Sequence, residues 1–219
     1  MASRFLELLD RRVTDGGVRV DLSTEATPDV VTALDPGAVI VATGASPHVP
    51  DLPLAGVDVQ QAWALLAGDV PTGRRVVVAD WGGDPSGLDA AELLAAAGNA
   101  VTLAVASVTV GEMLHQYRRN LYLQRLYRAG VEIRHHRELV GAKDGAVELR
   151  NVFARDLHEH VEADLLMLAQ GRVPVNDLAE ALRELALGVE EIGDCLSPRS
   201  LEEATLEASF AVRRLSAVA

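Results

Sequence analysis

The segment that decides the fold runs from residue 74 to residue 105 and reads RRVVVADWGGDPSGLDAAELLAAAGNAVTLAV. It contains a β-branched run at 76–78, a predicted helix at 88–97 that ends at Gly98, and a second apolar run at 101–105. Short runs of this kind favour buried strands, and a strand, a helix and a strand within about 30 residues form a parallel βαβ unit. The segment therefore predicts an α/β protein whose parallel sheet is covered by helices.

The same alternation continues on both sides of this unit. We expect further strands at 18–22, 38–42, 131–134, 165–169 and 189–192, further helices at 4–13, 28–34, 111–129 and 200–215, and a hairpin that turns at 143–145. The run at 38–42 is continuously apolar, which is typical of a strand buried on both faces. The stretch 44–56 holds three prolines and is expected to be a linker.

The order of these elements predicts two domains. Residues 1–59 and 172–219 are expected to form one discontinuous domain, and residues 60–171 are expected to form a second domain inserted into it. Hydrophobic residues make up 49% of the 219 residues and charged residues 24%, as in an ordinary globular protein.

Charge and cysteine content narrow the possible partners. The net charge of −12 disfavours a nucleic-acid partner or an anionic membrane, because a polyanion would be repelled. No apolar run approaches the roughly 20 residues of a membrane span, and no signal-peptide core is present, so a cytoplasmic protein is expected. The single cysteine, Cys195, excludes an iron–sulfur or zinc site built from several cysteines, and we expect it to be structural.

The turn after the strand at 76–78 is the place for a phosphate-binding loop. A dinucleotide fingerprint has three glycines, and the second one admits the pyrophosphate. With Gly87 aligned as the last glycine, Gly82 is the first and Asp84 takes the second position, where its carboxylate opposes a diphosphate. The loop is also about two residues longer than usual, and the next strand ends without an acid or an arginine for the ribose. We expect that NAD(P) binding has been lost here.

Five short segments resemble the flavin and pyridine-nucleotide disulfide-reductase superfamily: AVIVATGASP at 38–47, GRVP at 171–174, IGDC at 192–195, PR at 198–199 and LEEA at 201–204. The last three are similar to the C-terminal half of Old Yellow Enzyme-type NADH:flavin oxidoreductases. The loop at 80–87 is most similar to the amine dehydrogenases of that group, such as trimethylamine and histamine dehydrogenase. The resemblance implies Rossmann-like parallel sheets of the FAD/NAD(P)-binding disulfide-reductase type, with the first domain truncated.

The resemblance also implies four cofactor-binding residues. Thr43 and Gly44 match the Thr-Gly pair beside the adenine nucleotide, and Gly193 and Asp194 match a Gly-Asp motif whose amide and carboxylate lie against the flavin. Ser200 is expected to cap the last helix, whose N-terminus favours phosphate. No catalytic residue and no metal ligand is predicted.

Three parts of the full-length relatives have no counterpart in this sequence: the flavin-binding barrel, the cysteine cluster of a [4Fe–4S] centre, and a first Gly-x-Gly-x-x-Gly unit. The chain is expected to begin inside the first nucleotide domain, so FAD or ADP binding is expected to be weak without another polypeptide. An open sheet edge would then dock a flavin-barrel subunit or a second copy of the chain.

Several alternatives stay open. His158 and His160 share one face of a strand and suit a divalent metal, or they belong to an exposed hairpin. Trp63 is expected to pack on a helix. Trp81 either fills space that a nucleotide left or has no such role. The leading function is an accessory subunit of a flavin-dependent oxidoreductase without catalysis of its own. The alternatives are a free-standing interaction or nucleotide-sensing protein, and an FAD/NAD(P)H-dependent reductase.

Overall fold

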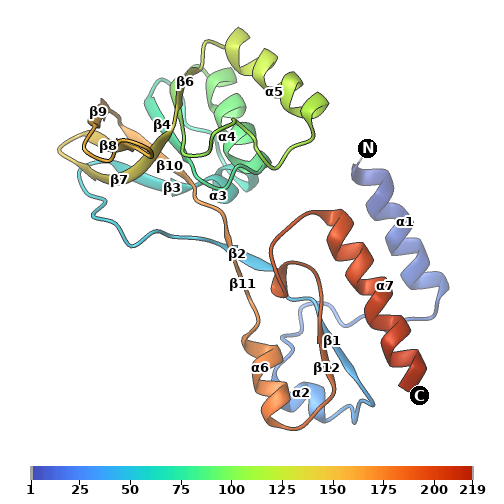
Figure 1. Ribbon diagram of the computed structural model, residues 1–219. Helices are drawn as coiled ribbons and strands as arrows, with labels where there is room; N and C mark the ends of the chain where they lie inside the picture. The colour runs from blue at the N-terminus through green and yellow to red at the C-terminus, as the bar shows by residue number, and fades with distance from the viewer. Residues whose placement is uncertain (1, 219) are drawn as a thin grey trace. The chain divides into compact units, whose positions relative to one another are not determined.

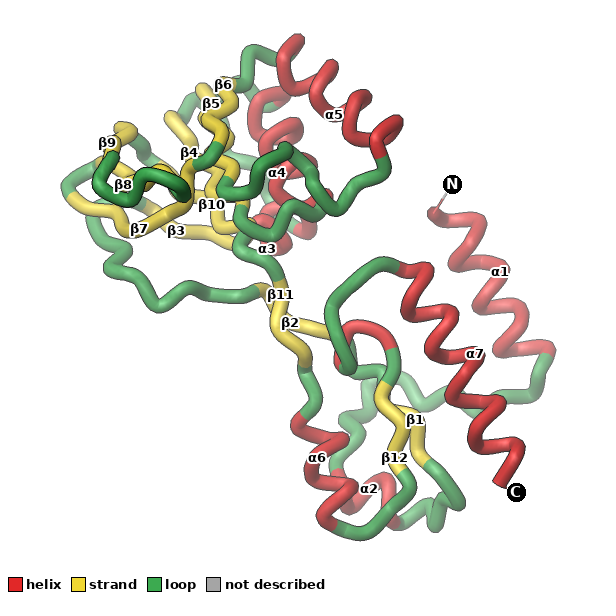
Figure 2. The backbone as a smooth tube through the Cα atoms, in the orientation of Figure 1, coloured by secondary structure: helices red, strands yellow, loops and turns green. Residues whose placement is uncertain are grey.

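The computed structural model describes residues 2–218 (Figures 1 and 2). The helices are α1 (Ala2–Asp15), α2 (Pro28–Thr32), α3 (Ala62–Ala67), α4 (Pro85–Ala96), α5 (Gln116–Arg128), α6 (Asp177–Glu184) and α7 (Leu201–Val218), with a 3₁₀ turn η1 (Gly193–Cys195). The strands are β1 (Val39–Val41), β2 (Ala45–Pro47), β3 (Asp58–Gln61), β4 (Arg75–Asp80), β5 (Ala100–Val105), β6 (Glu132–His135), β7 (Arg137–Lys143), β8 (Ala146–Asn151), β9 (His158–Glu162), β10 (Leu165–Ala169), β11 (Arg172–Pro174) and β12 (Val189–Glu191).

The chain separates into two compact units, and the first of them is discontinuous. It comprises residues 1–40 and 177–190, and the second comprises 41–176 and 191–219. These boundaries differ from the predicted ones at 59 and 172, so the predicted division into domains stays a prediction.

A five-stranded parallel sheet, in the order β3-β10-β4-β5-β6, forms the centre of the second unit. The α/β class and the βαβ unit predicted from residues 74–105 are therefore confirmed. All five residues of β10 are buried, because this strand lies between β3 and β4 and both of its faces are covered.

The two faces of this sheet pack against different layers. Because successive side chains of a strand point to opposite faces, β4 divides its residues between two cores. Val76 and Val78 join the cluster that includes Leu88 and Leu94 of α4, whereas Val77 joins the cluster with β7 and β8 residues. Figure 1 shows α4 and α5 on one side of the parallel sheet and the antiparallel sheet β7-β8-β9 on the other.

The predicted hairpin at 143–145 is confirmed. Asp144 and Gly145 connect β7 and β8, and both have positive φ angles, 52° and 81°. Asp and Gly tolerate this left-handed conformation better than most residues, which suits them to a tight hairpin turn.

Four expectations about the elements are wrong. Residues 18–22 form no strand, and their apolar side chains are exposed; alternation makes a strand only where a neighbouring strand pairs with it. The strand at 38–42 forms as β1, but it is not buried on both faces, since Ile40 is 38% exposed. The linker at 44–56 contains β2, which pairs antiparallel with β11 (Figure 2). Helix α5 begins at Gln116 rather than at Gly111, whose φ of 62° does not suit a helix.

Within residues 2–218, no helix combines the length and the apolar content that crossing a membrane would require.

Candidate functional site

The turn between β4 and α4 places a carboxylate of the protein itself at the start of the helix. Asp84 is the N-cap of α4, and its Oδ1 accepts hydrogen bonds from the Ser86 amide at 2.8 Å and from the Ser86 hydroxyl at 2.5 Å. Pro85 follows at the first helical position, where its fixed φ suits a helix. An acid at this position also interacts favourably with the helix dipole. The turn therefore presents a negative charge at the place where a bound diphosphate requires donors.

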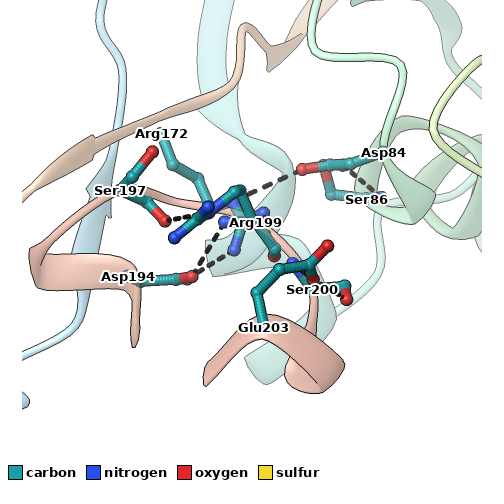
Figure 3. A network of polar contacts seen from close by, with 8 residues as sticks. All are labelled: Asp84, Ser86, Arg172, Asp194, Ser197, Arg199, Ser200 and Glu203. Carbon is teal, nitrogen blue, oxygen red and sulfur yellow. Dashed lines mark hydrogen bonds and ion pairs between the residues drawn. The ribbon is translucent and has the colours of Figure 1, made fainter. Parts of the chain in front are cut away.

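Arg172 connects this turn to a second one. Its Nε lies 3.6 Å from Oδ2 of Asp84, and its Nη1 lies 2.5 Å from Oδ2 of Asp194 (Figure 3). Its Nη2 donates to the carbonyl of Arg199 at 3.0 Å. The side chains of Arg172 and Asp84 are only 16% and 11% exposed, so water screens their ion pair less than it would at the surface.

The second turn leads from β12 through η1 to α7, and it too is held by carboxylates of the chain. Gly193, whose φ is 65°, donates its amide to Oε2 of Glu207 at 2.7 Å. The other oxygen of Glu207 pairs with the guanidinium of Arg199. Oδ1 of Asp194 accepts the Arg199 amide at 3.1 Å. The predicted amide and carboxylate of the Gly-Asp motif thus both have partners within the protein.

Ser200 caps α7, as the sequence predicts. Its Oγ accepts the Glu202 amide at 3.2 Å, and Glu203 accepts hydrogen bonds from the amide and the hydroxyl of Ser200. This reciprocal arrangement is a capping box. The Ser200 hydroxyl bond lowers the pKa of Glu203, so the cap is negatively charged at neutral pH.

The four predicted cofactor residues lie close together. Gly44, Gly193 and Asp194 line one cavity of about 410 Å³. Gly44 has a φ of 80°, and a Cβ atom there would meet nothing within 4 Å, so the cavity is open beside it. Thr43 donates its hydroxyl to the carbonyl of Val175. Whether these residues bind a nucleotide stays a prediction.

Asp80, the last residue of β4, is a buried carboxyl group beside the β4–α4 turn. Its side chain is buried; Oδ1 accepts the Gly83 amide at 3.0 Å, but Oδ2 has no hydrogen-bond partner. Burial, and to a lesser extent the charge of Asp84, raises the pKa of Asp80 to about 7. A Cβ atom at Gly87 would lie 3.0 Å from Cγ of Asp80, so this glycine is required by close packing.

A second close approach joins the turn to the end of β10. A Cβ atom at Gly82 would lie 3.1 Å from both the Cα and the amide nitrogen of Gly171. The amides of Trp81 and Gly82 both donate to the carbonyl of Ala169, at 3.1 and 3.3 Å. Residues 81–82 are thus in direct backbone contact with residues 169–171, and a side chain larger than that of glycine does not fit at position 82.

Trp81 is 62% exposed, and whether it fills space that a nucleotide left stays a prediction. Trp63 lies on α3, as expected, and is 37% exposed. Cys195 is buried, and its thiol donates to the carbonyl of Val41 at 3.1 Å. His158 contacts Glu148 at 2.7 Å, and in the described part of the chain no group of three or more candidate ligands lies close enough to hold a metal ion.

The sequence did not indicate Glu207 as a member of the site. It also did not show that Arg172 bridges Asp84 and Asp194. The GRVP motif at 171–174 indicated that the segment around Arg172 belongs to the site. No sequence pattern distinguishes Glu207 from the other acids of α7. Its partner is 14 positions away, and only the tertiary fold brings the two together.

Residues 9–196 match the family model described as pyridine nucleotide-disulphide oxidoreductase. Among curated proteins, the chain is 27% identical to a "Metal reductase" of Desulforamulus reducens over 89% of its own length and 33% of that protein's. It is 28% identical to a "Probable N-methylproline demethylase" of Rhizobium meliloti, over 80% of this chain and 26% of the relative. The chain thus spans between a quarter and a third of the length of these curated relatives.

Solved structures give the same result. Histamine dehydrogenase from Rhizobium sp. 4-9 superposes with a TM-score of 0.80 at 24% identity, over 90% of this chain and 33% of that one. A 2-naphthoyl-CoA reductase gives a TM-score of 0.75 at 26% identity, over 89% and 29%. The predicted resemblance to the FAD/NAD-binding portion of such flavoproteins, and the Rossmann-like fold that it implies, are confirmed.

Proposed function

Because this chain belongs to the pyridine nucleotide-disulphide oxidoreductase family, we propose that it is an accessory module of a flavin-dependent oxidoreductase and does not itself bind nicotinamide nucleotide. The chain spans between a quarter and a third of the length of its longer relatives, so we do not propose that it has their activity. Its role would be structural, with the redox chemistry at a flavin held elsewhere.

The observation that carries this proposal is the position of Asp84. Its carboxylate caps α4 and pairs with Arg172, so the donors that would receive a diphosphate are already used. A diphosphate placed about 4 Å from this carboxylate would meet a repulsion of about 4 kcal/mol per charge pair at an effective dielectric constant of about 20. A Cβ atom at position 82 would lie 3.1 Å from the backbone of Gly171, so this side of the turn is closely packed.

The second turn supports a weak adenine-nucleotide site at most. The cavity beside Gly44 has room, but the Gly193 amide is donated to Glu207 and the Asp194 carboxylate is paired with Arg172. An incoming FAD or ADP would have to displace these internal partners. We propose that a flavin-barrel subunit, or a second copy of the chain, completes the functional assembly.

Apolar side chains on α1 support a partner of that kind. Five of them are exposed on this one helix: Phe5, Leu6, Leu8, Leu9 and Val13. Several large apolar side chains exposed on one helix are typical of an interaction site.

The experiment that tests the proposal is calorimetric titration of the chain with NADH, using the wild type, Asp84→Gly and the control Asp69→Gly. Asp69 is exposed and its replacement changes the net charge equally. We expect no binding below about 1 mM for the wild type and the control, and at least a tenfold gain for Asp84→Gly, since the carboxylate that repels a phosphate is removed and Arg172 keeps only one of its two acidic partners. Micromolar binding by the wild type, or binding that Asp84→Gly leaves unchanged, would contradict the proposal.

The visible spectrum separates the remaining alternatives. A flavin band in the purified chain, retained on gel filtration, favours an FAD/NAD(P)H-dependent reductase. A colourless chain that takes up flavin only with a barrel-type flavoprotein present supports the accessory module. A colourless chain that never takes up flavin favours a free-standing interaction or nucleotide-sensing protein.

A further inference from the structure

A cleft of about 640 Å³ lies beside the capped turn and is not explained by an accessory role. It is bordered by α3, the start of α4, the segment before α5, and the start of α7. Its volume falls within the range of about 300–1,000 Å³ that is usual for small-molecule sites. Asp84 excludes a diphosphate from one end, but the rest of the cleft is open.

Apolar side chains form much of the wall. Trp63 and Leu66 of α3 are 37% and 44% exposed, Met113 is 57% exposed, and Leu201 is 63% exposed. Large apolar side chains are seldom gathered around one concavity without an apolar ligand or partner to cover them.

The charged groups of the cleft differ in how they are paired. Arg172 is engaged by Asp84 and Asp194, and Asp89 accepts the Tyr122 hydroxyl at 2.6 Å. Arg118 lies over the Tyr122 ring, 5.9 Å from its centroid. Within the described residues it forms no ion pair with a carboxylate.

Arg118, whose side chain also interacts with the Tyr122 hydroxyl, is therefore the cation of this cleft that no carboxylate of the described residues engages. His115 lies beside it and adds a second donor, whereas the exposed Glu202 lines the cleft from α7. Asp84 and Asp89 also line the cleft. An anionic group is therefore favoured only near Arg118 and His115 and disfavoured near these three acids, so the ligand has one preferred orientation.

We propose that this cleft binds a small organic anion with an aromatic or aliphatic body and one carboxylate. The body packs on Trp63, Leu66 and Met113, and the carboxylate forms a charge-assisted pair with the Arg118 guanidinium. A single planar carboxylate suits one guanidinium and needs no glycine-rich turn, which separates this ligand class from a dinucleotide.

The test uses 4-phenylbutyrate as the anionic probe and 4-phenylbutyramide as its uncharged match. Titration calorimetry is expected to give a dissociation constant of about 1 mM or tighter for the acid and at least tenfold weaker binding for the amide. Arg118→Gln should weaken binding of the acid about tenfold and leave the amide unchanged. Arg119→Gln, one residue further along α5 and outside the cleft lining, is the control and should change neither.

Tryptophan fluorescence locates the bound body. The chain has two tryptophans, so Trp63→Leu should abolish the fluorescence change on binding and Trp81→Leu should retain it. Thermal melts establish that each variant is folded before titration.

Three results would overturn the proposal: no binding of either probe up to about 10 mM, equal affinity for acid and amide, or an Arg118→Gln variant that binds the acid as the wild type does. None of these outcomes depends on NADH, so this inference and the accessory role can fail separately.

Discussion

Two turns of this chain use the same electrostatic arrangement but build it in different ways. In the β4–α4 turn and in the turn from β12 to α7, a carboxylate of the protein accepts a main-chain amide at a helix start or close to one. In the first turn the acid is Asp84, two positions from its donor Ser86. In the second it is Glu207, 14 positions beyond Gly193. The Asp84 contact is set by the local sequence, because donor and acceptor are neighbours. The Glu207 contact forms only when α7 packs beside Gly193.

Replacing Arg172 should lower the stability of the protein more than any other change proposed here, because Arg172 contacts both turns. Arg172→Met leaves Asp84 and Asp194 without their shared cation, and we expect the free energy of unfolding to fall by about 3 kcal/mol. Urea denaturation measures the loss. Arg155→Met, at an exposed arginine, is the control and should cost less than about 0.5 kcal/mol. Equal losses in the two variants would show that the bridge does not stabilise the fold.

Asp80→Asn changes only the β4–α4 turn, so it tests that turn separately from the second one. The pKa of Asp80 rises from the ordinary 3.8 to about 7 on folding, so the folded chain binds more protons than the unfolded chain between these values. The contribution of Asp80 to stability is therefore lost as the pH rises from about 4 to about 7. Asn keeps the oxygen that accepts the Gly83 amide but carries no charge.

We expect Asp80→Asn to be more stable than the wild type by about 2 kcal/mol at pH 8, and to show a smaller decline in stability with rising pH. Thermal unfolding at a series of pH values measures this. Asp69→Asn, at an exposed aspartate, should follow the wild-type curve. A wild type whose stability rises steadily over the same range, in parallel with Asp80→Asn, would refute the buried-acid account.

Glu207→Gln should give the smallest effect, confined to the second turn. Gln can still accept the Gly193 amide, but the ion pair with Arg199 is lost, so a cost of about 1 kcal/mol is expected. Glu202→Gln on the same helix is the matched control, because the Glu202 side chain is exposed, and it should be neutral. Titration calorimetry with ADP is a second measurement. The affinity for ADP should rise in Glu207→Gln and stay unchanged in Glu202→Gln. A Glu202→Gln variant that behaves like Glu207→Gln would show that only the net charge matters.

The sequence predicted those features whose physical cause is local. The βαβ unit, the Asp144 turn and the Ser200 cap each depend on residues within a few positions of one another, and all three form. The position of Asp84 in place of a glycine was visible for the same reason.

Features that depend on tertiary partners could not be read from the pattern. Residues 18–22 alternate as a strand does, but they pair with no strand in the described chain. Glu207 meets Gly193, and Arg172 meets Asp84, only after distant segments have packed together. The four predicted cofactor residues were placed by resemblance, and the structure gathers three of them around one cavity without testing what it binds.

The contact between Gly82 and Gly171 has a consequence for how this sequence can diverge. Since a Cβ atom at position 82 would lie 3.1 Å from the Gly171 backbone, a mutation there is tolerated only after the opposite segment has moved. Gly171 has a separate constraint, because its φ of 84° is a conformation that favours glycine. Both positions should therefore stay glycine in an alignment of descendants, each for its own reason.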